Sequence, residues 1–252
     1  MHRDELGRIL DGWLHPADFD DGAENGLQVE GRDEIRRVVL GVTANQDLIQ
    51  AAIEAEADAV VVHHGLIWGG GLRRLSGWQG RRVSNLFRHE ISLFAYHLPL
   101  DAHPELGNNA GLADALGLTA ARHPFGTYRG HRIGLAGEIE GPVPFAALLE
   151  RIRENVGEPV FAFGEADRTV RRVAVCSGGA ADLFQEAIDE GVDLYVTGEG
   201  AEWAQALARE CGTAFVAAGH HATEHFGVRR LTERLAGLGG IEARFVDVPN
   251  PA

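Results

Sequence analysis

The chain has no lysine and only two cysteines, Cys176 and Cys211, among its 252 residues. The cysteines show no C-x-x-C spacing and form no disulfide framework. Every fixed side-chain cation is an arginine, and the formal net charge is -14. That charge argues against sequence-independent nucleic-acid binding, which depends on cations that neutralise phosphates.

Long apolar runs and several common catalytic motifs are also missing. No apolar run reaches the length of a membrane-spanning helix, and the start of the chain, Met1-His-Arg-Asp-Glu, has no apolar leader segment. We therefore expect a cytoplasmic protein with no membrane association. The absence of HExxH, Walker A, GxGxxG and GxSxG motifs argues against a P-loop NTPase, a Rossmann dehydrogenase and a serine hydrolase.

Helical and strand patterns alternate along the chain, which predicts an α/β fold with largely parallel or mixed sheets. The predicted helices cover residues 3–14, 45–55, 80–89, 107–116, 145–156, 180–190, 201–210 and 223–236. The predicted strands cover residues 37–43, 58–62, 91–95, 170–175, 193–197, 213–217 and 242–247. A Gly-rich, alternating stretch after residue 122 predicts two α/β domains, 1–122 and 123–252, with a loose boundary. The last strand is free in this prediction to pack on either domain.

Histidines gather in three short stretches, each beginning where a predicted strand ends. The first is Val62-His63-His64-Gly65, the second runs from His97 to His103, and the third runs from His220 to His225. Ligands of α/β proteins usually bind at this edge of the sheet. Neighbouring side chains of a strand point to opposite faces, so His63 and His64 share a site only if the chain turns there, which Gly65 permits. They could equally serve two different metals.

Two carboxylates accompany the histidines. Asp101 lies in the second stretch, where it could be a metal ligand or a helix cap. His220 and Glu224 are four residues apart, so they share a helix face if the first helical turn has already formed. Thr223 is a plausible N-cap of the helix over 223–236, and Glu224 would then be favoured at a helix N-terminus without any metal.

Together these stretches offer five candidate metal ligands without cysteine: His63, His64, Asp101, His220 and Glu224. Imidazole and carboxylate bind divalent ions such as Zn, Mn, Fe, Co, Ni or Mg. Five ligands exceed what one catalytic metal needs and fit two ions that act together on oxygen anions. His97, Glu199 and His221 are candidate catalytic groups that could move protons.

Two further segments could contact an anionic substrate. The turn Ser177-Gly-Gly-Ala180 precedes a predicted helix, so its backbone N–H groups could bind phosphate, although a tight turn is the simpler interpretation. Arg73, Arg74, Arg81 and Arg82 flank Trp78 in the segment after His64. They could contact a triphosphate or a base, or form a solvated loop or a subunit contact.

The combined motifs resemble the Nif-three-like dinuclear metal-centre proteins, also called type-two GTP cyclohydrolase I homologues. The resemblance runs along nearly the whole chain, whose length is that of the short bacterial members without a middle domain. It rests on the segments Val-Val-His63-His64-Gly, Tyr-His97-Leu-Pro-Leu-Asp101-Ala-His-Pro-Glu-Leu-Gly-Asn-Asn, Thr-Gly-Glu199, Ala-Gly-His220-His221-Ala-Thr-Glu224 and the terminal Asp-Val-Pro-Asn-Pro-Ala. One nearby position departs from the pattern: His64-Gly65 stands where many relatives have His-Pro.

The resemblance implies a dinuclear site in a cleft between two α/β domains and a toroidal homohexamer. It implies that His64 and Asp101 hold one divalent ion, that His63 and His220 hold the other, and that Glu224 bridges them. His97 would be a nearby helper. The implied activity is that of a metal-dependent hydrolase acting on GTP or a related nucleotide. Two alternatives remain open: a hydrolase of another small ester or phosphoester, and a non-enzymatic metal-binding scaffold.

Overall fold

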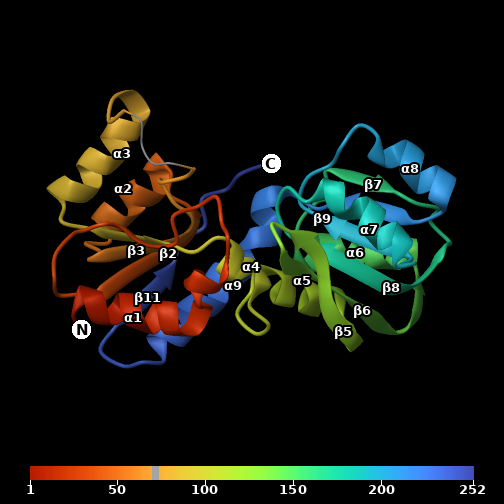
Figure 1. Ribbon diagram of the computed structural model, residues 1–252, viewed down its shortest axis with the longest axis horizontal. Coiled ribbons are helices and arrows are strands. Elements are labelled where there is room, and N and C mark those ends of the chain that lie inside the picture. The colour runs from red at the N-terminus through yellow and green to blue at the C-terminus, as the bar shows by residue number, and fades with distance from the viewer. Residues whose placement is uncertain (70–73) are drawn as a thin grey trace. The chain divides into compact units, whose positions relative to one another are not determined.

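The computed structural model describes residues 1–69 and 74–252, in which strands and helices alternate (Figure 1). The α-helices are α1 (Arg3–Leu14), α2 (Gln46–Glu54), α3 (Gly77–Arg88), α4 (Leu98–Ala102), α5 (Asn108–Leu116), α6 (Phe145–Asn155), α7 (Phe184–Asp189), α8 (Ala204–Cys211) and α9 (His220–Ala236). Two 3-10 helices are η1 (Pro16–Asp18) and η2 (Ala181–Leu183). The strands are β1 (Gly26–Val29), β2 (Arg37–Thr43), β3 (Ala59–His64), β4 (Ser92–Ala95), β5 (Leu118–Tyr128), β6 (His131–Pro144), β7 (Phe161–Phe163), β8 (Thr169–Cys176), β9 (Leu194–Thr197), β10 (Ala214–Ala217) and β11 (Glu242–Phe245).

The predicted α/β class is confirmed, and most predicted elements are present within a few residues. The helix over 3–14 and the strand over 37–43 have the predicted bounds. Six elements, β1, α4, β5, β6, β7 and η1, were not predicted. The prediction for Thr223 was wrong: α9 begins at His220, so Thr223 lies within the helix and is not its N-cap.

The described residues form two compact units. Unit 1 comprises residues 1–100 and 227–249, and unit 2 comprises 101–226 and 250–252. This division differs from the predicted domains 1–122 and 123–252, because the chain passes between units inside α4, inside α9 and again between Pro249 and Asn250. Residue composition does not change within a continuous helix where the chain leaves one unit for the other, so the sequence gives no sign of such a boundary. The Gly-rich stretch after residue 122 belongs instead to the antiparallel pair β5 and β6.

Unit 1 is a five-stranded sheet in the order β1-β4-β3-β2-β11. Its strands are parallel except β1, which pairs antiparallel to β4 at one edge. The last strand, whose domain the sequence left open, pairs with β2 here. Helices α2 and α3 cover one face and α1 covers the other (Figure 1). Continuous β-branched runs such as Val60–Val62 are buried on both faces, as a covered parallel strand requires.

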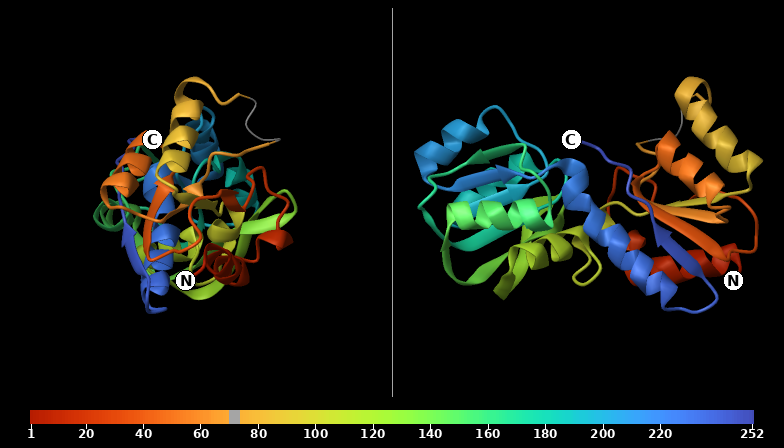
Figure 2. Two further views of the ribbon diagram at one scale, coloured as in Figure 1. Left: turned by 90° about the vertical axis from the view of Figure 1, so that its left-hand side faces the viewer. Right: turned by 180° about the vertical axis from the view of Figure 1, so that it is seen from behind.

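Unit 2 is a six-stranded mixed sheet in the order β5-β6-β8-β9-β10-β7, with β8, β9 and β10 parallel. Alternate residues of β9 and β10 face opposite sides. Val196 and Val216 belong to a core with Leu148 of α6, whereas Tyr195 and Phe215 contact Phe184 of α7. Accordingly, α7 lies in front of this sheet in Figure 1, and α6 lies in front of it in the reverse view of Figure 2.

Among the described helices, none combines the length and apolarity needed to cross a bilayer.

Candidate metal centre

Three histidine rings of unit 1 lie close together. His63 and His64 end β3, and their ring centroids are 4.5 Å apart with planes tilted by 46°. The ring of His97, which follows β4, lies 5.1 Å from His63 and 5.8 Å from His64 between centroids. One nitrogen of each ring can be chosen so that all three atoms lie within 4.8 Å of one another. We call these residues the histidine cluster.

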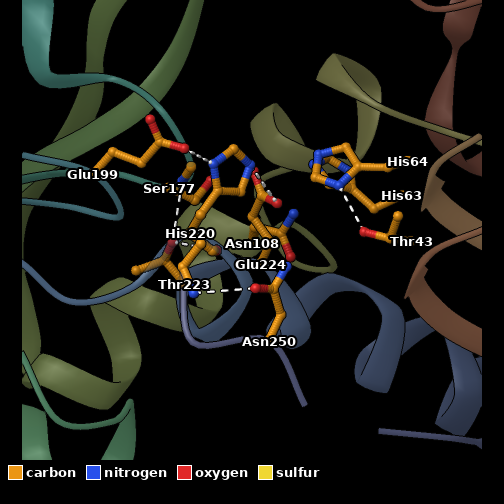
Figure 3. A network of polar contacts seen from close by, with 12 residues as sticks. Thr43, His63, His64, Asn108, Ser177, Glu199, His220, Thr223, Glu224 and Asn250 are labelled. Atoms are coloured by element: carbon orange, nitrogen blue, oxygen red, sulfur yellow. Dashed lines mark hydrogen bonds and ion pairs between the residues drawn. The ribbon is translucent and has the colours of Figure 1, made fainter. Parts of the chain in front are cut away.

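Hydrogen bonds at Nδ1 fix the orientation of His63 and His64. His63 Nδ1 lies 3.0 Å from the carbonyl oxygen of Tyr96, which can only accept, so Nδ1 carries the proton. His64 Nδ1 lies 3.1 Å from the hydroxyl of Thr43 (Figure 3). Nε2 is therefore the atom through which each ring would bind a metal. Metal-binding histidines usually have this second hydrogen bond.

Gly65 allows this strand end to form because it is small. It does not have a left-handed backbone, and a Cβ there would lie 2.3 Å from Gln28 Oε1. The same amide oxygen accepts the N–H groups of Leu66 and Ile67 at 2.7 and 3.1 Å. Close approach of Gln28 to the chain, rather than a special turn, therefore requires glycine after His64.

His97 is held by a carboxylate that the sequence analysis did not identify. Asp21 Oδ1 lies 2.8 Å from His97 Nδ1, and Asp21 also accepts the N–H groups of Ala23 and Leu98 and the amide of Asn25. Burial raises the pKa of Asp21, but the hydrogen bond and charge of His97, with the bonds from Asn25 and Ala23, outweigh it and hold the pKa well below its usual range. Asp21 is thus an ionised group that orients the His97 ring.

A second group, in unit 2, contains the two predicted carboxylate ligands and His220; we call it the carboxylate cluster. Asp101 Oδ1 accepts a hydrogen bond of 2.9 Å from Asn108 Nδ2 and another of 2.9 Å from Ser177 Oγ. His220 Nε2 lies 3.2 Å from Glu224 Oε2 across one turn of α9 (Figure 3). A ligand atom of Asp101 lies within 4.8 Å of one of Glu224. Asp101 and Glu224 are both buried.

The turn after β8 holds the start of α9 in place. Gly178 donates its N–H to Thr223 Oγ1 at 3.0 Å, and its backbone is left-handed, with φ +67°. A Cβ at Gly178 would lie 2.3 Å from Glu224 Oε1, so only glycine leaves room for this carboxylate. Ser177 donates its N–H to Asn109 Oδ1 at 2.8 Å. The Ser177 and Gly178 N–H groups, considered above for phosphate binding, therefore bond within the protein.

Glu199 lies beside His220. Its Oε1 is 2.6 Å from His220 Nδ1, so the carboxylate orients the ring as Asp21 orients His97 (Figure 3). Burial lowers the pKa of His220, but the hydrogen bonds that His220 donates to Glu224 and Glu199, with the charges of these carboxylates, outweigh it and raise the pKa to about 9. His221 is rotated by about 100° around the helix axis from His220. Its backbone N–H donates to the carbonyl of Ala252.

The sequence analysis identified the ionisable candidates but missed most of their neutral partners. Asn108, Asn109 and the Tyr96 carbonyl gave no signal of their own, because amides and backbone carbonyls have no characteristic spacing. The Asn-Asn pair after Asp101 was visible only as part of the family motif. Arg73 lies outside the described residues, and Arg82 lines a pocket beside His64.

Both clusters fit divalent metal ions by the chemistry of their donors. They present imidazole nitrogens and carboxylate oxygens, the usual ligands of zinc and other first-row ions. Each of His63, His97 and His220 has Nδ1 against an oxygen that can only accept, so Nδ1 carries a proton and Nε2 is the nitrogen that would bind a metal.

Comparisons with known proteins identify the family. The family model described as Duf34/NIF3 (NGG1p interacting factor 3) matches residues 1–251. The chain belongs to the Duf34/NIF3 family. A Neisseria meningitidis serogroup A relative named "GTP cyclohydrolase 1 type 2 homolog" is 47% identical over 239 residues, covering 95% of this chain and 94% of the relative.

Solved structures extend the Duf34/NIF3 likeness to the fold. A structure described as "protein ybgI, unknown function" is 41% identical, with a TM-score of 0.92 and full coverage of both chains. TTHA1606 from Thermus thermophilus is 34% identical, with a TM-score of 0.85 over 100% of this chain and 99% of that one. The resemblance found in the sequence is therefore confirmed.

Proposed function

We propose that this Duf34/NIF3 protein is a hydrolase that depends on two divalent metal ions and acts on GTP or a related nucleotide. The ligands would be His63, His64, Asp101, His220 and Glu224. One observation carries the proposal: imidazoles in both clusters are fixed through Nδ1 and grouped with metal-type donors. Such hydrogen bonding is characteristic of metal-binding histidines.

The proposal assigns ligands from both clusters to the two ions. The chain passes between units at Leu100–Asp101, directly at one carboxylate and shortly after His97. It passes again at Phe226–Gly227, two residues after Glu224. In this proposal His64 and Asp101 hold one ion, and His63 and His220 hold the other. Glu224 would bridge the two ions.

Divalent ions, when bound, supply Lewis acidity and a water of lowered pKa. The chain's own residues would provide orientation and proton handling. Asp21 holds the His97 ring by its Nδ1, so Nε2 of His97 is the atom that would exchange a proton with substrate. Glu199 positions His220, and Ser177 with Asn108 positions Asp101. His221 stays a candidate proton carrier from α9.

The decisive experiment is mass spectrometry of GTP incubated with untagged protein loaded in turn with Zn, Mn, Fe(II) or Mg. A ring-opened formylated product or a pterin triphosphate is expected, and Asp101→Asn should abolish it. Asp182→Asn, which changes an exposed carboxylate of η2, is the matched control and should keep activity. Unchanged GTP with every metal, from protein shown to hold two ions, would refute the nucleotide proposal.

The same preparations separate the alternatives. Metal-dependent cleavage of generic phosphoesters without GTP turnover would indicate a different hydrolase. No turnover of either substrate class, with normal complementation in cells by Asp101→Asn, would indicate a metal-binding scaffold.

We also propose the toroidal homohexamer that the family resemblance implies. Light scattering on a sizing column should give six times the chain mass of 27.2 kDa. A monomer or dimer at the concentrations used for activity would contradict this assembly.

A further inference from the structure

A pocket of about 360 Å³ lies beside His64 within unit 1. Side chains from three segments line it: Thr43, His64, Trp68, Trp78, Gln79 and Arg82. Pockets that bind small molecules usually measure about 300–1,000 Å³, so this one suits a ring system rather than a whole nucleoside triphosphate. Through His64 it adjoins the histidine cluster.

Trp68 forms the wall nearest the histidine cluster. Its Nε1 donates to the carbonyl of Gly65 at 3.0 Å, which fixes the plane of the indole. The ring centroid lies 5.9 Å from that of His64 and 4.9 Å from that of His97, with the His97 contact edge to face. The hydrogen bond and the two ring contacts hold this indole in a defined orientation.

Trp78 and Arg82 form another part of the lining, from the first turns of α3. The guanidinium carbon of Arg82 lies 4.8 Å from the Trp78 ring centroid, a cation–π geometry. Trp78 is nevertheless 56% exposed, so much of its large apolar surface contacts no other part of the described chain. An aromatic side chain held by its neighbour yet open to solvent is suited to stacking on a planar ligand.

The charges of the pocket lining favour a planar ring over a phosphate chain as the ligand. Apart from His64, Arg82 is the one ionisable side chain among the described residues that line the pocket. Several cations would be needed to balance a triphosphate, particularly in a chain of net charge -14. A planar ring needs only the indoles and the flat guanidinium, with the Thr43 hydroxyl and the Gln79 amide available at its edges.

We infer that this pocket binds the planar heterocyclic base of the substrate, stacked on Trp78 and placed next to His64. The inference rests on the proposed function in that it names the part of a nucleotide that this pocket holds. It assigns base recognition to Trp68, Trp78 and Arg82, and leaves the phosphates outside the pocket.

The test is calorimetric binding of guanosine and, separately, of inorganic tripolyphosphate to the full-length zinc-loaded protein. Trp78→Ala should weaken guanosine binding by about fivefold to a hundredfold, the range for loss of one base-stacking contact. Trp78→Phe should restore most of the affinity. Tripolyphosphate binding should not change in either variant. Trp203→Ala, which removes a partly exposed tryptophan of unit 2, is the matched control.

Each other outcome overturns the inference. No guanosine binding, or equal binding by wild type and Trp78→Ala, would exclude a base pocket here. A change of oligomeric state in Trp78→Ala on light scattering would assign the indole to a contact between chains instead.

Failure of the inference and failure of the proposed function give different results. GTP turnover with an unchanged KM in Trp78→Ala would remove the inference and keep the function. Guanosine binding that requires Trp78, without GTP turnover with any metal, would keep the inference and refute the proposed function.

Discussion

The histidine cluster of unit 1 contains only imidazoles at strand ends, whereas the carboxylate cluster of unit 2 contains two buried carboxylates set by α9 and the turn after β8. A neutral imidazole is inexpensive to bury once one nitrogen is hydrogen-bonded. A buried carboxylate needs a balancing positive charge. Without metal, His220 supplies that charge to Glu224, because its pKa is raised to about 9. The two clusters therefore bring complementary chemistry to a cation.

The residues that orient the two clusters also differ. Asp21, which holds His97, is buried and accepts several backbone and side-chain donors. Glu199, which holds His220, is half exposed, so water can solvate much of its carboxylate. The comparison indicates that Asp21 also supports the fold, whereas Glu199 acts mainly on its histidine.

The largest expected effect separates a bridging ligand from a ligand of one ion. Glu224→Gln should lose both ions, with affinity falling at least about a hundredfold, because both depend on the shared carboxylate. His64→Gln should lose one. Metal content after dialysis, measured by mass spectrometry, gives the stoichiometry. Glu233→Gln, an exposed change on the same helix, should keep two ions. Two ions retained by Glu224→Gln would refute the ligand set.

The next effect tests how tightly the carboxylate cluster is packed. Gly178→Ala should lower the free energy of unfolding by about 2–4 kcal/mol and weaken metal binding, because the new Cβ meets Glu224 and strains a left-handed backbone. Gly130→Ala is the matched control: φ there is +84° but no atom is near the added Cβ. It should cost only about 1–2 kcal/mol, from the backbone alone. Equal losses on urea unfolding of the two variants would contradict the packing argument.

The orienting residues provide an intermediate test. Asp21→Asn and Glu199→Gln should each weaken metal binding by about tenfold to a hundredfold in a chelator competition. Asp21→Asn should also lower the free energy of unfolding of metal-free protein by about 1–3 kcal/mol, because a buried donor loses its acceptor. Glu199→Gln should change it by less than about 0.5 kcal/mol. Equal destabilisation of the metal-free protein by Asp21→Asn and Glu199→Gln would contradict the conclusion that Asp21 supports the fold and Glu199 acts mainly on His220.

The smallest expected effect is the pH-dependent stability contributed by a residue pair of unit 2 that does not belong to the carboxylate cluster. The hydrogen bond that His123 donates to the Glu190 carboxylate, followed by the one it donates to the Ala121 carbonyl, raises the pKa of His123. The pKa of His123 is higher in the folded state than in the unfolded state. The His123–Glu190 pair therefore contributes its full stabilisation below the ordinary histidine pKa, and this stabilisation is lost as pH rises through the raised pKa. His123→Gln should cost under about 1 kcal/mol at pH 6 and nothing at high pH, because the pair is partly exposed. Urea unfolding at both pH values would measure it; a cost that grew with pH would contradict the sign.

Much of the fold was predictable because hydrophobic periodicity is a local property. The apolar run ending at His63 and His64 marked a covered strand, and the periodic leucines of α1 marked its bounds. Short elements such as β7 and α4 carry too few residues for a period to show. The division into units was not predictable, because α9 carries one amphipathic pattern through residues that belong to both.

The sequence by itself determined the α/β class, the family and the ionisable residues of both clusters, because residue type and spacing carry that information. Tertiary structure alone decided how those residues are oriented. The Asp21 contact to His97 joins residues 76 positions apart, as does the Ser177 contact to Asp101. Such contacts depend on how strands and helices pack, and packing brings together residues between which the sequence shows no relation.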